Sequence, residues 1–141
     1  MDMNYFRTLI AVADDSPVSR SVVPAERGAK KTVAVLQYEM LVDHPYVHTQ
    51  PDVLFGVWLQ RRDPAGSPSD EDAARLREDF FAKPQPCLRS SPLPKKYGWG
   101  LVFDRDGRVA LCPMESEEYR QITAGDVDGV TVLKALRSRR A

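Results

Sequence analysis

Two pairs of lysines and two aromatic residues are the side chains of this sequence best suited to bind a ligand. They are Lys30, Lys31, Lys95, Lys96, Tyr97 and Trp99. The first pair comes just before a helix expected to begin at Thr32, and the unpaired N–H groups of a first helical turn favour anions. If the fold brings the two pairs together, they form a basic pocket with an aromatic wall for a small molecule that carries phosphate or carboxylate. The alternative is that both pairs are separate, solvated surface charges.

The segment from Lys95 to Phe103 has a second interpretation. It mixes basic and aromatic residues on an expected strand, a pattern that nucleic-acid-binding domains use to stack bases and contact phosphates. Such a platform needs a second aromatic on the exposed face, whereas Leu101 and Phe103 share the face of Trp99. The structural alternative is a strand that packs Trp99 against the second helix.

Four side chains near the junction of the first two helices could hold a metal ion. They are Asp43, His44, His48 and Asp52. Pro45 disrupts helical spacing between the histidines, so we expect His44 to end one helix and Asp52 to cap the next. We therefore expect no metal, and no motif in the sequence indicates another cofactor.

The remaining reactive groups give no catalytic pattern. No histidine is adjacent in sequence to Cys87 or Cys112, and we expect both to be unbridged thiols in a reducing compartment. Glu115, Glu117 and Glu118 could include an acid with a raised pKa, but carboxylates in a first helical turn are usually solvated.

Composition limits the class of protein. The chain has 141 residues, with 20 Lys and Arg against 20 Asp and Glu. This length supports one hydrophobic core without disulfides or metals, so we expect a single domain over residues 1–141. Its longest apolar run, from Leu9 to Ala13, is too short for a membrane helix, and its start lacks the pattern of a signal peptide. We expect a soluble cytoplasmic protein with no membrane partner.

Periodicity and turn residues predict the elements of the first two thirds of the chain. We expect a strand over 5–13, a loop over 14–31, and helices over 32–43 and 49–62. The second helix is apolar on several faces, so it should be central, with Trp58 buried. A third helix should begin with Ser67 as cap and Pro68 at its first position, and run to about residue 83 with Leu76 and Phe80 facing inward. Four prolines over 84–94 predict an extended segment with at most a short turn over 87–89.

The last third predicts a hairpin, a helix and a tail. Trp99 to Phe103 and Arg108 to Leu111 flank the turn Asp104-Arg105-Asp106-Gly107, and a short helix should follow over 115–122. Residues 131–141 are basic and are expected to form a flexible tail. The fold class is α+β, with a small antiparallel sheet of the N-terminal strand and the hairpin packed against three to four helices.

Several short motifs, spread over nearly the whole chain, resemble a known family. They are Asn4-Tyr5 with Thr8, Lys30-Lys31-Thr32, Tyr38-Glu39, His44-Pro45-Tyr46, Asp52-Val53-Leu54-Phe55, Phe80-Phe81-x-Lys83-Pro84, Ser91-Pro92-Leu93-Pro94-Lys95, Tyr97-Gly98-Trp99-Gly100 and Glu115-Ser116-x-Glu118-Tyr119. The sequence resembles the domain-of-unknown-function 6157 family, small and mostly bacterial proteins. The resemblance implies one compact domain and transfers no catalytic residue.

These observations favour a soluble binding module for a small anionic ligand or a protein partner. One alternative is a nucleic-acid-binding domain that uses the strand over 95–103. The other is an enzyme whose site is assembled from residues distant in sequence. Neither the ligand nor the oligomeric state follows from the residues.

Overall fold

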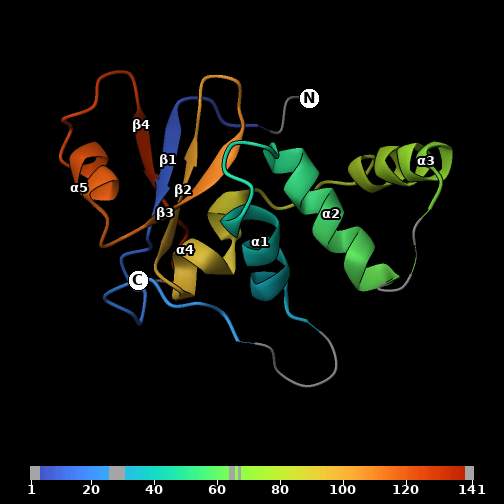
Figure 1. Ribbon diagram of the computed structural model, residues 1–141, viewed down its shortest axis with the longest axis horizontal. Coiled ribbons are helices and arrows are strands. Elements are labelled where there is room, and N and C mark those ends of the chain that lie inside the picture. The colour runs from blue at the N-terminus through green and yellow to red at the C-terminus, as the bar shows by residue number, and fades with distance from the viewer. Residues whose placement is uncertain (1–3, 26–30, 64–65, 67, 139–141) are drawn as a thin grey trace.

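The computed structural model describes residues 4–25, 31–63, 66 and 68–138 (Figure 1). In this part of the chain the strands are β1 (Thr8–Ala11), β2 (Trp99–Phe103), β3 (Val109–Pro113) and β4 (Thr131–Lys134). The helices are α1 (Val33–Val42), α2 (Gln50–Arg62), α3 (Asp70–Phe81), α4 (Pro92–Lys96) and α5 (Glu117–Thr123), with a 3-10 turn, η1, at Leu88–Ser90. None of the described helices is long and apolar enough to cross a membrane.

The chain is α+β, as predicted, but the sheet is mixed and not purely antiparallel. Its strand order is β3-β2-β1-β4. The predicted hairpin is confirmed, with Leu101 opposite Leu111, and β1 joins β2 in antiparallel register, with Leu9 opposite Val102. The fourth strand, β4, runs parallel to β1, which the sequence interpretation missed.

β4 lies in the segment expected to be a basic tail. The N–H of Thr131 donates to the carbonyl of Arg7, and the N–H of Ala135 donates to the carbonyl of Ala11, each over 2.8 Å. These bonds fix residues 131–134 along the sheet edge. The end of the tail, residues 139–141, lies outside the described residues.

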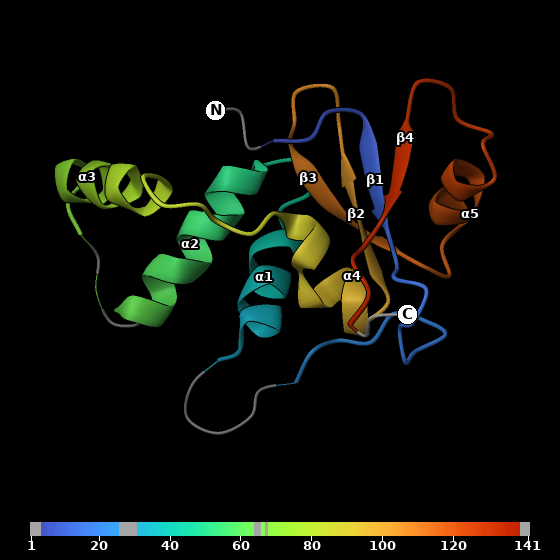
Figure 2. The same cartoon turned by 180° about the vertical axis from the view of Figure 1, so that it is seen from behind.

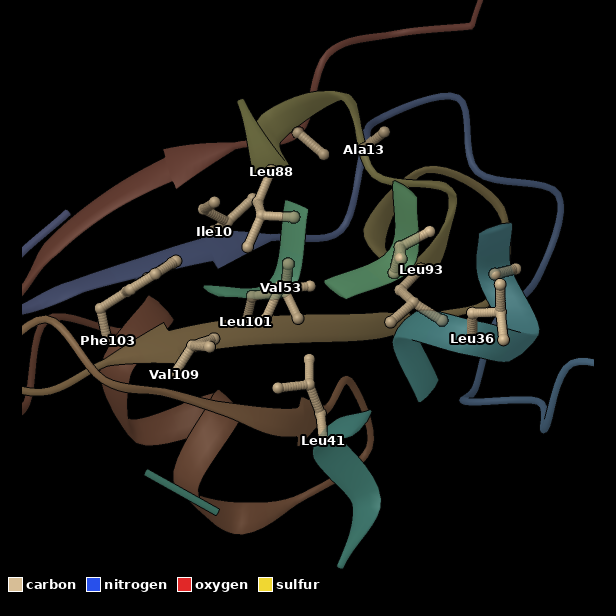
Figure 3. Packing of buried hydrophobic residues seen from close by; sticks show 13 residues of the cluster. Ile10, Ala13, Leu36, Leu41, Val53, Leu88, Leu93, Leu101, Phe103 and Val109 are labelled. Atoms are coloured by element: carbon tan, nitrogen blue, oxygen red, sulfur yellow. The ribbon is translucent and has the colours of Figure 1, made fainter. Parts of the chain in front are cut away.

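Both faces of the sheet are covered (Figures 1 and 2). Alternate strand residues point to opposite faces: Leu101 and Phe103 pack with the cluster that includes α1, α2, η1 and α4, and Val102 packs with the cluster that includes Ile122 of α5. In Figure 3, side chains from helices and strands converge on the first face, with Leu88 and Leu93 near the strand residues. This larger cluster is the main hydrophobic core.

The helices α1 and α2 both begin after a capping residue, and the sequence predicted the cap of α2. The side chain of Thr32 accepts a hydrogen bond from the N–H of Val35. At α2 the hydroxyl of Thr49 accepts from the N–H of Asp52 while the Asp52 carboxylate accepts from the N–H of Thr49, a reciprocal capping box.

α3 differs from the prediction in both its start and its burial. The N-cap is Ser69, whose side chain accepts from the N–H of Asp72, so Pro68 precedes the helix; Ser67 lies outside the described residues. No residue of α3 is buried, and Leu76 and Phe80 are only half-buried. Figure 1 shows α3 at the far end of the molecule from the sheet, where it can bury little of its apolar face.

α2 is not the central element, and the prediction that Trp58 is buried is wrong. The buried residues of α2 include Val53 and Val57, whereas Trp58 is half-buried. Its indole packs against Phe55, at 5.8 Å between ring centroids, and against Phe80, at 5.2 Å. These contacts shield only part of the ring because α2 leads away from the sheet towards α3 (Figure 1).

The proline-rich segment is also more regular than predicted. The short turn occurs as η1, and Pro92 then begins α4, with the side chain of Ser91 accepting from the N–H of Leu93 as its N-cap. The first N–H groups of a helix have no intrahelical acceptor, so prolines are tolerated there. Pro92 and Pro94 therefore start a helix instead of preventing one.

Candidate functional site

The lysines of the predicted site that the structure describes have different surroundings. Lys30 lies outside the described residues. Lys31 pairs with Glu39 at 2.9 Å. Lys95 and Lys96 form the last turn of α4, just before the hairpin, as the sequence suggested.

Tyr97 and Trp99 are tied to the loop that follows β1. The carbonyl of Tyr97 accepts a 2.8 Å hydrogen bond from the N–H of Val22, and the indole N–H of Trp99 donates a 2.8 Å bond to the carbonyl of Val22. The ring of Trp99 also packs against Tyr38 of α1, with centroids 5.4 Å apart, and not against the second helix as expected. Trp99 faces the main core together with Leu101, as the alternation of the strand predicted.

The other candidate reactive groups are held in structural contacts. The rings of His44 and His48 lie 6.1 Å apart, and among the described residues no group of three or more His, Cys, Asp or Glu could hold a metal ion. Asp52 is in the capping box of α2 and pairs with Arg77 of α3 at 3.0 Å. Hydrogen bonds from Ser21 lower the pKa of Glu115, so this acid does not have the raised pKa considered for it.

Both cysteines are free thiols with different surroundings. Cys112 is fully buried, and burial raises the pKa of its thiol to about 12. Cys87 is half-buried and accepts a 3.3 Å hydrogen bond from the hydroxyl of Tyr5. Burial and this contact with Cys87 raise the pKa of Tyr5 to about 12, so the phenol keeps its proton and holds the sulfur in place.

A pocket of about 280 Å³ lies where α1, α2 and the end of α3 meet the segment that leads into α4. Its apolar walls come from α1, α2, α3 and the proline-rich segment, namely Val33, Leu54, Val57, Trp58, Phe80, Pro86, Leu88 and Pro92. None of the five predicted site residues in the described part of the chain lines it. Three chain segments far apart in sequence build it, and this separation explains why no local motif indicated it.

The polar groups of the pocket are few. Neutral ones are contributed by Gln37, Gln85, Cys87, Ser90 and Ser91, and Arg61 is the one charged residue among the described lining residues. Arg61 is exposed and, in the described part of the chain, its guanidinium has no ion-pair partner. Among the described residues of the lining there is no histidine, aspartate or glutamate. This chemistry suits binding of a mostly apolar molecule with an anionic end.

One signal in the sequence pointed towards this pocket. Trp58 and Arg61 are three residues apart on a predicted helix and therefore share a face. The helix was expected to be central, so Trp58 was assigned to the core.

Comparison with protein-family models gives a match along the whole chain. The matching model is described as a family of unknown function (DUF6157), and it covers residues 1–141. The chain belongs to the DUF6157 family. Comparisons with curated proteins and with solved structures give no significant match. The pocket of this DUF6157 protein must therefore be interpreted from its own residues.

Proposed function

We propose that this DUF6157 protein is a binding module for a small amphipathic acid, a mostly apolar molecule that carries one carboxylate. The observation that carries the proposal is the position of Arg61 as the only charged residue among the described lining of an otherwise apolar and neutral pocket. The apolar body of the ligand lies between Val57, Trp58 and Phe80, and the carboxylate pairs with the arginine.

Physical chemistry supports each half of this ligand. Burial of apolar surface contributes roughly 25 cal/mol per Å² removed from water, which favours an aliphatic or aromatic body in such a pocket. A guanidinium donates two parallel hydrogen bonds to a carboxylate, which favours an acid over an alcohol or an amine. The ligand class is the small anion that the sequence predicted, but its place is the pocket and not the lysine pairs.

Isothermal titration calorimetry with three ten-carbon molecules tests the charge requirement. Decanoate should bind with a stoichiometry of one, while decan-1-ol and decylammonium should bind more weakly. Arg61→Gln should weaken decanoate binding by about threefold to tenfold, as expected for a partly exposed charged pair. Arg62→Gln is the matched control, because Arg62 lies over the Trp58 ring, 5.2 Å from its centroid, and is not among the described lining residues of the pocket.

Three results would change the assignment. Equal binding of decanoate and decylammonium would contradict selection of an anion by Arg61. Loss of decanoate binding in Lys31→Ala/Lys96→Ala but not in Arg61→Gln would return the site to the lysine pairs. Salt-sensitive binding of a short single-stranded oligonucleotide, without binding of decanoate, would favour the nucleic-acid alternative.

The cellular location belongs to the same proposal. Two free thiols, Cys87 and Cys112, support a reducing compartment, and we propose the cytoplasm. Fractionation of cells that express the full chain from its native start, with detection by a tag, measures the location directly.

A further inference from the structure

The side chains of Gln37 and Ser91 are the most buried polar groups in the described lining of the pocket. Gln37 lies on α1 and is 4% exposed. Its amide oxygen accepts a 2.5 Å hydrogen bond from the hydroxyl of Ser91, which itself accepts a bond from the N–H of Leu93. The cap of α4 therefore fixes the orientation of this amide.

The amide nitrogen of Gln37 is different from its oxygen. Among the described residues it has no hydrogen-bond partner, although Gln37 lines the pocket. The nitrogen is not among the fully buried unpaired side-chain atoms of the described residues, so solvent in the pocket still reaches it. A ligand that fills the pocket without an acceptor would remove this donor from water, which costs roughly 1–3 kcal/mol. Buried polar groups in native proteins are almost always paired, so an unpaired donor at a cavity is a site for an acceptor.

Gln85, the second glutamine of the lining, provides a contrast. Its amide nitrogen donates a 2.8 Å hydrogen bond to the carbonyl of Phe80, at the end of α3. Gln85 is half-buried, and its amide nitrogen already has a hydrogen-bond acceptor within the protein. Of these two amides, only that of Gln37 combines burial with an unpaired N–H group.

We infer that Gln37 selects a ligand that carries a hydrogen-bond acceptor, such as a ketone carbonyl, within its apolar body. The inference rests on the proposed function, because the acid group is assigned to Arg61 and the second acceptor to Gln37. The ligand class is then an oxo-acid: an aliphatic or aromatic acid with a carbonyl oxygen at a distance from its carboxylate. A plain fatty acid fills the same volume but leaves the Gln37 donor unpaired.

Calorimetry with decanoate and with 4-, 6- and 8-oxodecanoate tests this inference on the wild-type protein. At least one oxo-isomer should bind more tightly than decanoate, by about twofold to tenfold, the gain expected for one added hydrogen bond. The three isomers should differ from one another, because the positions of Arg61 and Gln37 are both fixed by α-helices. The preference needs no variant, so it can be measured even if a substitution disturbs folding.

Two variants then identify the group responsible. Gln37→Met keeps the length of the side chain and removes the amide, so it should abolish the preference for the oxo-isomer while decanoate still binds. Gln85→Met is the matched control, and it should keep the preference. Thermal unfolding of both variants reports whether the fold is retained.

The outcomes separate the inference from the proposed function. If decanoate binds but no oxo-isomer binds more tightly, or if Gln37→Met keeps the preference, the inference is wrong and the proposed function stands. If none of the four acids binds, the proposed function fails and this inference fails with it. Tight binding of an isomer that Gln37→Met alone weakens would support both.

Discussion

The backbone N–H of Leu88 donates a 2.8 Å hydrogen bond to the side-chain amide oxygen of Gln50, 38 residues earlier in the chain. Gln50 is in the first turn of α2, and both residues are almost completely buried. Leu88 belongs to the 3-10 turn that forms one wall of the pocket. This single bond therefore positions the proline-rich segment against α2, and the pocket depends on it.

Removal of the Gln50 amide should destabilise the fold. Gln50→Met leaves the buried N–H of Leu88 without an acceptor, and we expect the free energy of unfolding to fall by about 1–3 kcal/mol. Gln60→Met, on the exposed part of the same helix, is the control and should change it by less than about 0.5 kcal/mol. Urea unfolding measures both variants; equal effects would show that the bond to Leu88 contributes no stability.

The capping box of α2 should make stability depend on pH. Partial burial would raise the pKa of Asp52, but hydrogen bonds from the N–H of Thr49, from Arg77 and from the hydroxyl of Thr49 outweigh it and lower the pKa. A carboxyl group with a lowered folded-state pKa contributes stability above its unfolded pKa of about 3.9 and loses that contribution as the pH falls through the folded value.

Asp52→Asn should therefore be less stable than the wild type at pH 7, by about 1 kcal/mol, and this difference should disappear in acid below the folded-state pKa. Urea unfolding at pH 7, 4 and 2.5 measures the difference. Asp79→Asn, an exposed position on α3, controls for the general effect of removing a charge. A difference of the same size at pH 7 and at pH 2.5 would exclude a role for the carboxylate charge.

The parts of the fold that sequence reasoning predicted are those encoded by neighbouring residues. Thr49 and Asp52 mark the start of α2 because the two side chains cap a helix only at that spacing. The hairpin turn is equally local: the carboxylate of Asp104 accepts from the N–H of Asp106, and Gly107 adopts a φ of +77°. Such interactions act within a few residues, so the sequence displays them directly.

The parts that were missed depend on distant partners. β4 pairs with β1 across more than 120 residues, and most of its residues are exposed, so the segment has no strong apolar alternation. The pocket depends on Gln37, Arg61 and the residues around Cys87, which only the packing of α1, α2 and the proline-rich segment brings together. The hydrophobic character of Trp58 follows from its residue type, but which neighbours cover its ring depends on the packing of α2 against α3.

The two thiols should differ in their reactivity with iodoacetamide at neutral pH. Burial raises the pKa of Cys112 to about 12, so its thiol should stay unmodified in the folded protein. Cys87 is half-buried in the pocket lining and should be the modified residue, identified by mass spectrometry of peptides. Cys87→Ser should abolish labelling under native conditions, because Cys112 should stay unmodified in this variant as well. Saturating decanoate should slow labelling of the wild type, whereas modification of Cys112 first would contradict the burial described here.

Two aromatic truncations should have unequal costs. Phe103 is 1% exposed in the main core, so Phe103→Ala should cost about 3–5 kcal/mol. Trp58 is half-buried at the pocket, so Trp58→Ala should cost less, about 1–3 kcal/mol. Chemical denaturation of both variants measures the difference, and a larger loss for Trp58→Ala would restore α2 as the centre of the core.

Alanine substitutions at Gly98 and Gly125 distinguish the cost of backbone strain from the cost of steric overlap. Both glycines have a left-handed φ, +75° and +82°, which costs a residue with a Cβ roughly 1–2 kcal/mol. A Cβ at Gly125 would meet nothing within 4 Å, whereas a Cβ at Gly98 would lie 2.6 Å from the backbone oxygen of Arg20. Gly125→Ala should therefore show the cost of φ alone, and Gly98→Ala should cost about 2 kcal/mol more, because the loop at Arg20 must move away.

That movement has a second, local readout. The loop carries Val22. The N–H of Val22 donates to the carbonyl of Tyr97, just before the hairpin, and the carbonyl of Val22 accepts from the indole N–H of Trp99. In Gly98→Ala the indole N–H of Trp99 should exchange with solvent faster, as seen by heteronuclear NMR, while that of Trp58 should not change. In Gly125→Ala both indole signals should keep their wild-type exchange rates. The contrary result is an equal loss of stability in the two alanine variants, with the Trp99 signal still protected. It would show that the loop accommodates the added methyl group. It would also show that the contact of the loop with Gly98 does not hold Val22 in place.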